Sequence, residues 1–208
     1  MIKIGWFSPA LALVLSGCMI PAIPFDESSP RPVPSVTQSP QKIDEDAFWA
    51  IVEDARARGQ GDPDRMAAAL DYRFYDANDE TIRAFQEQLV AASMRLYTWR
   101  HGEAAELICG RLGPDQFTDW RSWVISLGRD TFASVAANPD NIADVQDLGG
   151  GCAMLAESFG WAAFNAYWER HQNADGLAEL EPSFDPSGVQ LHGKDAIRAA
   201  LPKVAARA

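Results

Sequence analysis

The densest mixture of charged and aromatic side chains lies between Asp115 and Asp130, where carboxylates and arginines alternate with tryptophans. Such a mixture can line a polar pocket or anchor an interface, because Trp and Arg dominate binding hot spots. The candidate ligand-binding or partner-binding residues are Asp115, Arg121, Trp123 and Arg129. The alternative is structural. Every third or fourth residue of this stretch is apolar, as on a buried helix face, with Asp115 as a cap and the arginines paired to nearby acids.

Other residues that could do chemistry form no catalytic or metal-binding pattern. His101, His171 and His192 lack the close spacing of metal ligands. Residues 156–160 (AESFG) approach the Gly-x-Ser-x-Gly nucleophile motif, but that motif needs a strand before a sharp turn, and this stretch has a helical pattern. No glycine-rich loop follows a strand, so nucleotide binding has no support. We expect no cofactor, no metal and no catalytic residue, and we favour a non-enzymatic role.

The chain has three cysteines, Cys18, Cys109 and Cys152. If Cys18 is modified at the N-terminus, the other two form an even set that could pair as a disulfide in an oxidising compartment. The alternative is two buried helix thiols that never meet, because the sequence alone does not give the distance between them.

The N-terminus has the pattern of a lipoprotein signal peptide. Residues 1–17 carry one charged side chain, Lys3, and then a largely apolar run that is too short to span a bilayer, which takes roughly 20 apolar residues. The sequence LSGC at residues 15–18 resembles the lipobox of bacterial lipoproteins. The resemblance implies cleavage before Cys18 and acylation of its thiol, which would anchor the protein to a membrane.

The segment that follows favours this interpretation. Residues 18–43 are rich in proline and serine without any helical or alternating period, which predicts a disordered tether. Because residue 19 is Met and not Asp, the lipobox resemblance implies the outer membrane, facing the periplasm, in a Gram-negative host. The predicted partners are the membrane, through Cys18, and an envelope protein. The alternatives are an apolar N-terminal strand and a cytoplasmic protein whose apolar N-terminus is not cleaved.

From residue 44 to residue 208 the periodicity predicts one all-α domain of several helices. Asp62 followed by Pro63, and Asn78, are expected to cap two of these helices. A third helix is expected over the apolar stripe of residues 117–127, ended by Gly128. A short helix is expected near residues 194–201.

Glycines are expected to interrupt the chain at Gly102, at residues 113–114 and at residues 149–151. The last of these precedes a predicted helix over residues 152–171 with apolar residues on several faces, which predicts a central helix surrounded by neighbours. Its second apolar face consists of Trp161, Phe164 and Trp168.

The net charge narrows the choice of partners. The 208 residues include 18 Lys and Arg against 29 Asp and Glu, which gives a net charge of −11. Nucleic-acid binding is disfavoured, because its affinity comes largely from cationic side chains at phosphates. Anionic membrane surfaces are disfavoured for the same reason.

Five short motifs occur in a distinctive order: Phe48-Trp49, Tyr97-Thr98-Trp99, Asp115-x-Phe117, Arg121-x-Trp123-x-Ile125 and Asn138-Pro139-Asp140. They resemble the bacterial domain of unknown function 4240 over most of residues 44–172. The resemblance implies a small helical domain and supplies no catalytic residue.

Three functional hypotheses follow. The first is a lipid-anchored envelope protein whose helical domain is a binding or protein-interaction module. The second is an enzyme or small-ligand binder with a polar pocket near Asp115, Arg121 and Arg129. The third is a cytosolic protein. A membrane anchor determines where a protein is located and not what it does, so its activity must be inferred from a binding or catalytic site.

Overall fold

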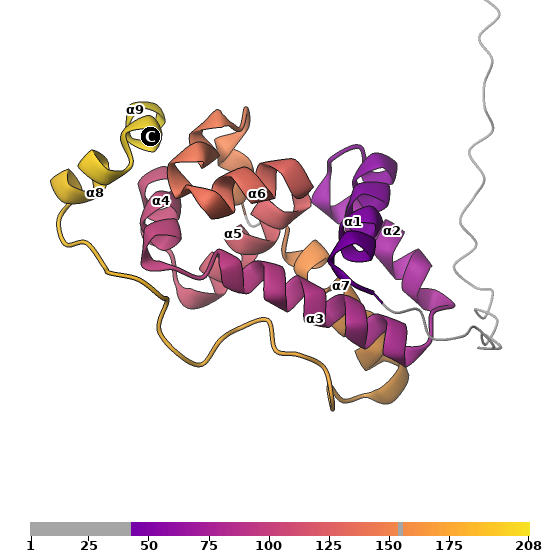
Figure 1. Cartoon of the computed structure of the whole chain (residues 1–208). Helices are drawn as coiled ribbons and strands as arrows, with labels where there is room; N and C mark the ends of the chain where they lie inside the picture. Colours follow the sequence, from indigo (N-terminus) through magenta and orange to yellow (C-terminus); the bar gives the residue numbers. More distant parts are fainter. Residues whose placement is uncertain (1–42, 154–155) are drawn as a thin grey trace, which may run out of the picture. The chain divides into compact units, whose positions relative to one another are not determined.

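The computed structural model describes residues 43–153 and 156–208 (Figure 1). These residues are mainly helical and contain no strand apart from one isolated bridge between Thr98 and Ser187. The predicted all-α fold is therefore confirmed for this part of the chain. The helices are α1 (Glu45–Gly59), α2 (Pro63–Tyr75), α3 (Asp79–Arg95), α4 (Trp99–Cys109), α5 (Pro114–Ser126), α6 (Arg129–Ala137), α7 (Glu157–His171), α8 (Lys194–Ala200) and α9 (Pro202–Arg207). Two 3-10 helices, η1 (Pro139–Asp144) and η2 (Leu148–Gly151), lie between α6 and α7.

Several N-terminal predictions fall outside this part of the chain. The predicted signal peptide (residues 1–17), the lipidation at Cys18 and all but the last residue of the predicted tether (residues 18–43) are not among the described residues. Among the helices that are described, none is long and apolar enough to cross a membrane.

Short polar side chains begin the first three helices. Asp44, Asp62 and Asn78 have extended backbone conformations, and each side chain accepts a backbone N–H from the first turn of its helix. The predicted caps at Asp62 and Asn78 are confirmed. Each cap satisfies a donor that the helix cannot pair internally, which contributes about 1 kcal/mol.

Helix α4 corrects one expectation. The sequence predicts an interruption at Gly102, but Gly102 lies inside α4 and donates its backbone N–H to Thr98 O at 3.1 Å. The side chain of Thr98 caps this helix by accepting the N–H of His101. A helical glycine costs only about 1 kcal/mol relative to alanine, so the cap and the buried Ala104 and Ala105 are sufficient to keep the helix continuous.

The core lies between α1, α2, α3, α5 and α7. Phe85 on α3 packs against Phe48 and Phe74, with ring centroids 5.1 and 5.0 Å apart. On the far side of α1, Trp49 meets Phe132 of α6 at 4.8 Å. Each of these rings is almost completely buried, and burial of a side chain of this size contributes about 2 to 3 kcal/mol.

Helix α7 begins later than the sequence predicts. The expected helix starts at residue 152, but the backbone N–H of Cys152 bonds to Gly149 O at 3.0 Å in a turn, and α7 begins at Glu157. Cys152 therefore lies in the turn that follows η2, outside the helix.

The second apolar face of α7 is also less covered than expected. The helix contacts α2, α3 and α5, which bury Phe159, Ala163 and their neighbours. Trp161, Phe164 and Trp168 instead contact one another along the outer side: Trp161 meets Phe164 edge to face, Phe164 stacks on Trp168, and Trp168 is 43% exposed. The expectation that neighbours surround α7 is thus wrong for this face, because the three aromatic side chains pack within their own helix.

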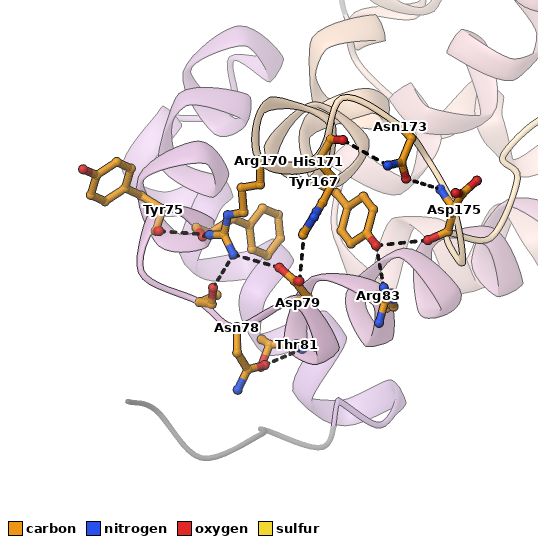
Figure 2. Close-up of polar contacts among 12 residues, drawn as sticks. Tyr75, Asn78, Asp79, Thr81, Arg83, Tyr167, Arg170, His171, Asn173 and Asp175 are labelled. Atoms are coloured by element: carbon orange, nitrogen blue, oxygen red, sulfur yellow. Dashed lines mark hydrogen bonds and ion pairs between the residues drawn. The ribbon is translucent and has the colours of Figure 1, made fainter. Parts of the chain in front are cut away.

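Arg170 joins α7 to the end of α2 and the start of α3 (Figure 2). Its guanidinium donates to Asp79 Oδ1 at 3.2 Å, and His171 Nε2 lies 2.9 Å from the other oxygen of the same carboxylate. It also donates to three backbone carbonyls in the last turn of α2 and just after it, where helix carbonyls commonly need partners from outside the helix. These carbonyls belong to Phe74, Tyr75 and Ala77.

Tyr167 extends this junction towards the C-terminal part of the chain (Figure 2). Its hydroxyl donates to Asp175 O at 3.0 Å and accepts a hydrogen bond from Arg83. The Arg83 guanidinium carbon lies 5.0 Å from the centroid of the Tyr167 ring, which is the geometry of a cation–π contact.

After α7 an extended segment, residues 174–191, passes along α3 and α4 before α8 begins (Figure 1). We call this segment the strap. Hydrogen bonds join its backbone to the helical body along its length, among them those of Tyr167 with Asp175, Gln86 with Ala178, Tyr97 with Phe184 and with Ser187, Trp99 with Ser187, and Glu103 with Leu191. Beyond it, Asp140 accepts the N–H groups of Lys203 and Val204 and so holds the start of α9. The chain is therefore held to the helical body along the strap and again at the start of α9.

Candidate ligand-binding site

A cavity of about 320 Å³ lies between α4, α5 and the strap. This volume is at the lower end of the range for small-molecule sites. One wall comes from α4 and the loop after it, a second from α5, and a third from the strap. The lining residues are Tyr97, Trp99, Gly102, Glu103, Glu106, Leu112, Gly113, Pro114, Phe117, Thr118, Arg121, Glu181, Pro182, Asp185, Pro186 and Gln190.

Arg121 lies at the inner side of this cavity and is 0% exposed. Each nitrogen of its guanidinium donates to the protein: Nε to Phe117 O, Nη1 to Ser93 Oγ at 2.7 Å, and Nη2 to Thr118 Oγ1 at 2.8 Å. Its guanidinium carbon also lies 4.8 Å from the ring centroid of Tyr97 and 5.3 Å from that of Phe117. Residues 117 and 118 lie four and three positions before Arg121 on α5, so the helix itself brings Phe117 O and Thr118 Oγ1 to the guanidinium.

Burial lowers the pKa of Arg121 to about 10, while the charge of Glu181 opposes this change. The side chain therefore remains protonated at neutral pH. Within the described part of the chain, no carboxylate forms an ion pair with it. Hydrogen bonds to neutral oxygens and two aromatic rings compensate the buried charge.

Glu103 is the most buried carboxylate of the cavity, with 5% exposure. One oxygen accepts the backbone N–H of Leu191 in the strap. The other lies 3.1 Å from Arg100 Nη1 in an ion pair but accepts no hydrogen bond of good geometry from the described residues. The remaining carboxylates, Glu106 on α4 and Glu181 and Asp185 on the strap, are exposed.

Aromatic rings form much of the rest of the wall. Tyr97 and Phe117 stack with centroids 6.0 Å apart, and Trp99 at the start of α4 is half-buried beside the cavity. The cavity thus combines three aromatic side chains with four carboxylates and one committed arginine.

The structure places the four sequence-selected residues in different environments. Only Arg121 lines the cavity. Asp115 is exposed in the first turn of α5. Arg129 is half-exposed and pairs with Asp46 at 2.7 Å. The expected convergence of Asp115, Arg121 and Arg129 on one pocket is not found.

Trp123 is a core residue and not a surface anchor. It is 4% exposed and packs on Trp120, with ring centroids 6.2 Å apart. Its indole also lies against Gly151, where an added Cβ would sit 2.6 Å from Trp123 Cε3. This close approach explains the glycine at position 151.

Glu103, Glu106 and Trp99 were not selected from the sequence. Trp99, Glu103 and Glu106 fall at i, i+4 and i+7 of α4, so one helical stripe through Gly102 would have brought them together. Asp119 was also missed: it is buried, and its burial, together with the neighbouring carboxylates of Glu157 and Asp115, raises its pKa to about 6.

Cys109 and Cys152 form a disulfide, with Cα atoms 5.1 Å apart. The bond joins the last residue of α4 to the turn after η2. Because α4 supplies one wall of the cavity, this bond fixes that wall against the body of the domain.

His101, His171 and Ser158 make structural contacts. His101 is buried, and its two ring nitrogens lie 2.8 Å from Thr98 Oγ1 and 3.1 Å from Val135 O; burial lowers its pKa to about 4. His192 is exposed, and Ser158 donates to Asp64 at 2.8 Å. Among the residues described, no group of three His, Cys, Asp or Glu side chains could hold a metal ion.

The order and spacing of the motifs on α1, α4 and α5 can now be compared with known families. The family model described as "Protein of unknown function (DUF4240)" matches residues 43–169, more than half of the chain. The chain belongs to the DUF4240 family. Searches of the curated proteins and of the solved structures found no significant match. The DUF4240 match ends before the strap, so Glu181, Asp185 and Gln190 line the cavity from outside the matched region.

Proposed function

We propose that this DUF4240 domain is a binding module that holds a small molecule in the cavity between α4, α5 and the strap. One observation carries this proposal: polar and aromatic side chains from three separate segments converge on a hollow of about 320 Å³. Small-molecule sites have this combination of apolar walls and a few placed polar groups. The catalytic alternative has less support, because the carboxylates of the cavity are not arranged with a nucleophile and base among the described residues.

Gly102 offers a test that does not depend on knowing the ligand. A Cβ added there would lie 3.8 Å from the Phe117 ring, an ordinary contact, so Gly102→Ala should fold and gain about 0.5 to 1 kcal/mol in the unfolding free energy. Gly102→Met extends a longer side chain from the same position into the cavity. We expect small fragments that bind the native chain in ligand-observed NMR to bind Gly102→Ala and to be lost from Gly102→Met.

Two results would contradict the proposal. One is a fragment library that yields no ligand for the native chain. The other is a set of fragments that bind Gly102→Met as well as the native chain, because their site would then lie elsewhere. Thermal unfolding of all three proteins serves as the control for folding.

We further propose that the chain is exported and anchored to the membrane through an acylated Cys18, as the lipobox-like sequence predicts. The disulfide between Cys109 and Cys152 supports export, because such bonds persist in oxidising compartments and are rare in the cytosol. Metabolic labelling with a fatty acid should mark the native chain and not Cys18→Ala. Equal labelling of both chains, or of neither, would contradict the anchor.

A further inference from the structure

The charged side chains that line the cavity are mostly acidic. Four carboxylates line it, from Glu103, Glu106, Glu181 and Asp185, against a single cation, Arg121. Three carboxylates are exposed at the surface and one, Glu103, is 5% exposed. Because walls of low dielectric strengthen the field of such groups, the cavity favours positive charge within it.

Arg121 does not offset this preference by offering an anion site. It is 0% exposed, and Nε, Nη1 and Nη2 already donate to Phe117 O, Ser93 Oγ and Thr118 Oγ1. An anionic ligand would have to displace these bonds and also approach four carboxylates. The positive charge is therefore committed to the fold, whereas three of the four negative charges, on Glu106, Glu181 and Asp185, are exposed at the hollow.

Glu103 is placed to receive a cation. Its Oε1 is fixed by the N–H of Leu191, and its buried Oε2 has only the ion pair with Arg100, without a well-oriented hydrogen bond from the described residues. A buried carboxylate oxygen gains most from a donor that brings its own charge. Trp99, on the same face of α4, adds an aromatic surface of the kind that attracts cations.

We infer that the cavity binds an organic cation carrying N–H donors, an amidinium, guanidinium or primary ammonium group, with Glu103 as its principal charge partner. This inference rests on the proposed binding function and names the class of its ligand. The exposed carboxylates of Glu106 and Asp185 contribute smaller, salt-sensitive attractions, and the planar part of the cation lies against Trp99 and Phe117.

Three probes of nearly equal shape test the charge class: benzamidine, benzamide and benzoate. Isothermal titration calorimetry with the full-length chain should give benzamidine an affinity at least about tenfold higher than benzamide, with benzoate weakest, because a cation meets both a buried carboxylate and aromatic faces. Glu103→Gln keeps the shape and an acceptor for Leu191 and should reduce the ratio of benzamidine to benzamide affinity to about two or less.

Glu106→Gln keeps the test decisive if Glu103→Gln folds poorly. Removing the exposed charge of Glu106 should lower the benzamidine affinity by about two- to threefold at low salt and leave the benzamide affinity unchanged. Glu169→Gln on α7, which removes the same charge away from the cavity lining, should change neither affinity.

The outcomes separate the ligand class from the binding function. Tighter binding of benzoate or benzamide than of benzamidine overturns the cationic class, while Gly102→Met sensitivity of those probes would preserve the binding function. Binding of benzamidine that survives Gly102→Met overturns the site. If neither these probes nor any other fragment binds in a Gly102→Met-sensitive manner, the binding function itself fails.

Discussion

Two arginines of the same domain, Arg170 and Arg121, are stabilised by opposite kinds of partner. Arg170, with its side chain 23% exposed, ion-pairs with Asp79 and caps the carbonyls at the end of α2. Arg121 is completely buried and, within the part of the chain that the structure describes, contacts only neutral oxygens and aromatic rings. At the junction the opposite charges neutralise one another, whereas at the cavity the carboxylates face the hollow.

This difference distinguishes a polar cluster that stabilises the fold from a site that can bind a ligand. The junction of α2, α3 and α7 has its charges paired within the protein, so a ligand would gain little there. Among the described residues, three of the four cavity carboxylates, those of Glu106, Glu181 and Asp185, form no ion pair, and the fourth, Glu103, pairs with Arg100. Charges that the fold leaves facing a hollow are the ones available for binding.

The largest predicted effect concerns the disulfide that holds the cavity side. Cys109 and Cys152 are 43 positions apart, and closing a loop of that length stabilises by about 4 kcal/mol in the chain-entropy model. The double variant Cys109→Ser, Cys152→Ser should lose about this much unfolding free energy in urea titrations. Dithiothreitol should lower the stability of the native chain and leave the double variant unchanged, and equal sensitivity of both would show that the bond is not formed.

At the junction, Arg170→Met should cost about 3 kcal/mol of unfolding free energy, because it removes the hydrogen bond to Asp79 Oδ1 and the donors to three backbone carbonyls at once. Urea titration measures this loss. Arg73→Met on the exposed side of α2 is the matched control and should change the stability by less than about 0.5 kcal/mol. A loss equal to that of the control would mean that Arg170 does not hold the junction.

At the cavity, Arg121→Met should cost less, about 1 to 2 kcal/mol, since the lost hydrogen bonds are partly offset by no longer burying a charge. It should also raise benzamidine affinity by about two- to fivefold, because a like charge leaves the cavity wall. Calorimetry distinguishes this from an anion site, where removing Arg121 would instead abolish benzoate binding.

The last effect depends on pH and concerns Asp119. Its pKa of about 6 in the folded protein exceeds the value of 3.8 expected for the unfolded chain, so the unfolding free energy falls as the pH rises from about 4 to about 6. Asp119→Asn should therefore be more stable than the native chain by about 1 to 2 kcal/mol at pH 8, with the difference vanishing below pH 4. A constant difference across this range would mean that Asp119 does not titrate with a raised pKa.

Local signals predict the helices well, and long-range contacts limit the prediction of the site. The caps at Asp62 and Asn78 need only residues within one turn, so their sequence patterns suffice. The burial of Arg121 depends on Ser93, 28 positions earlier in the chain. Glu181 and Asp185 reach the cavity in a segment without periodicity, and no pattern in the sequence shows which helices it follows.

The strap also affects how this domain can diversify. Its cavity-facing residues Glu181, Asp185 and Gln190 are exposed, lie beyond the region that matches the family, and carry no part of the helical core. Mutations at these three positions can therefore change the side chains on one wall of the cavity while the residues of the helical core stay unchanged. On the proposed binding function, relatives that share α1 to α7 but differ in the strap are expected to accept different molecules, and grafting one strap onto another helical body would change the selectivity.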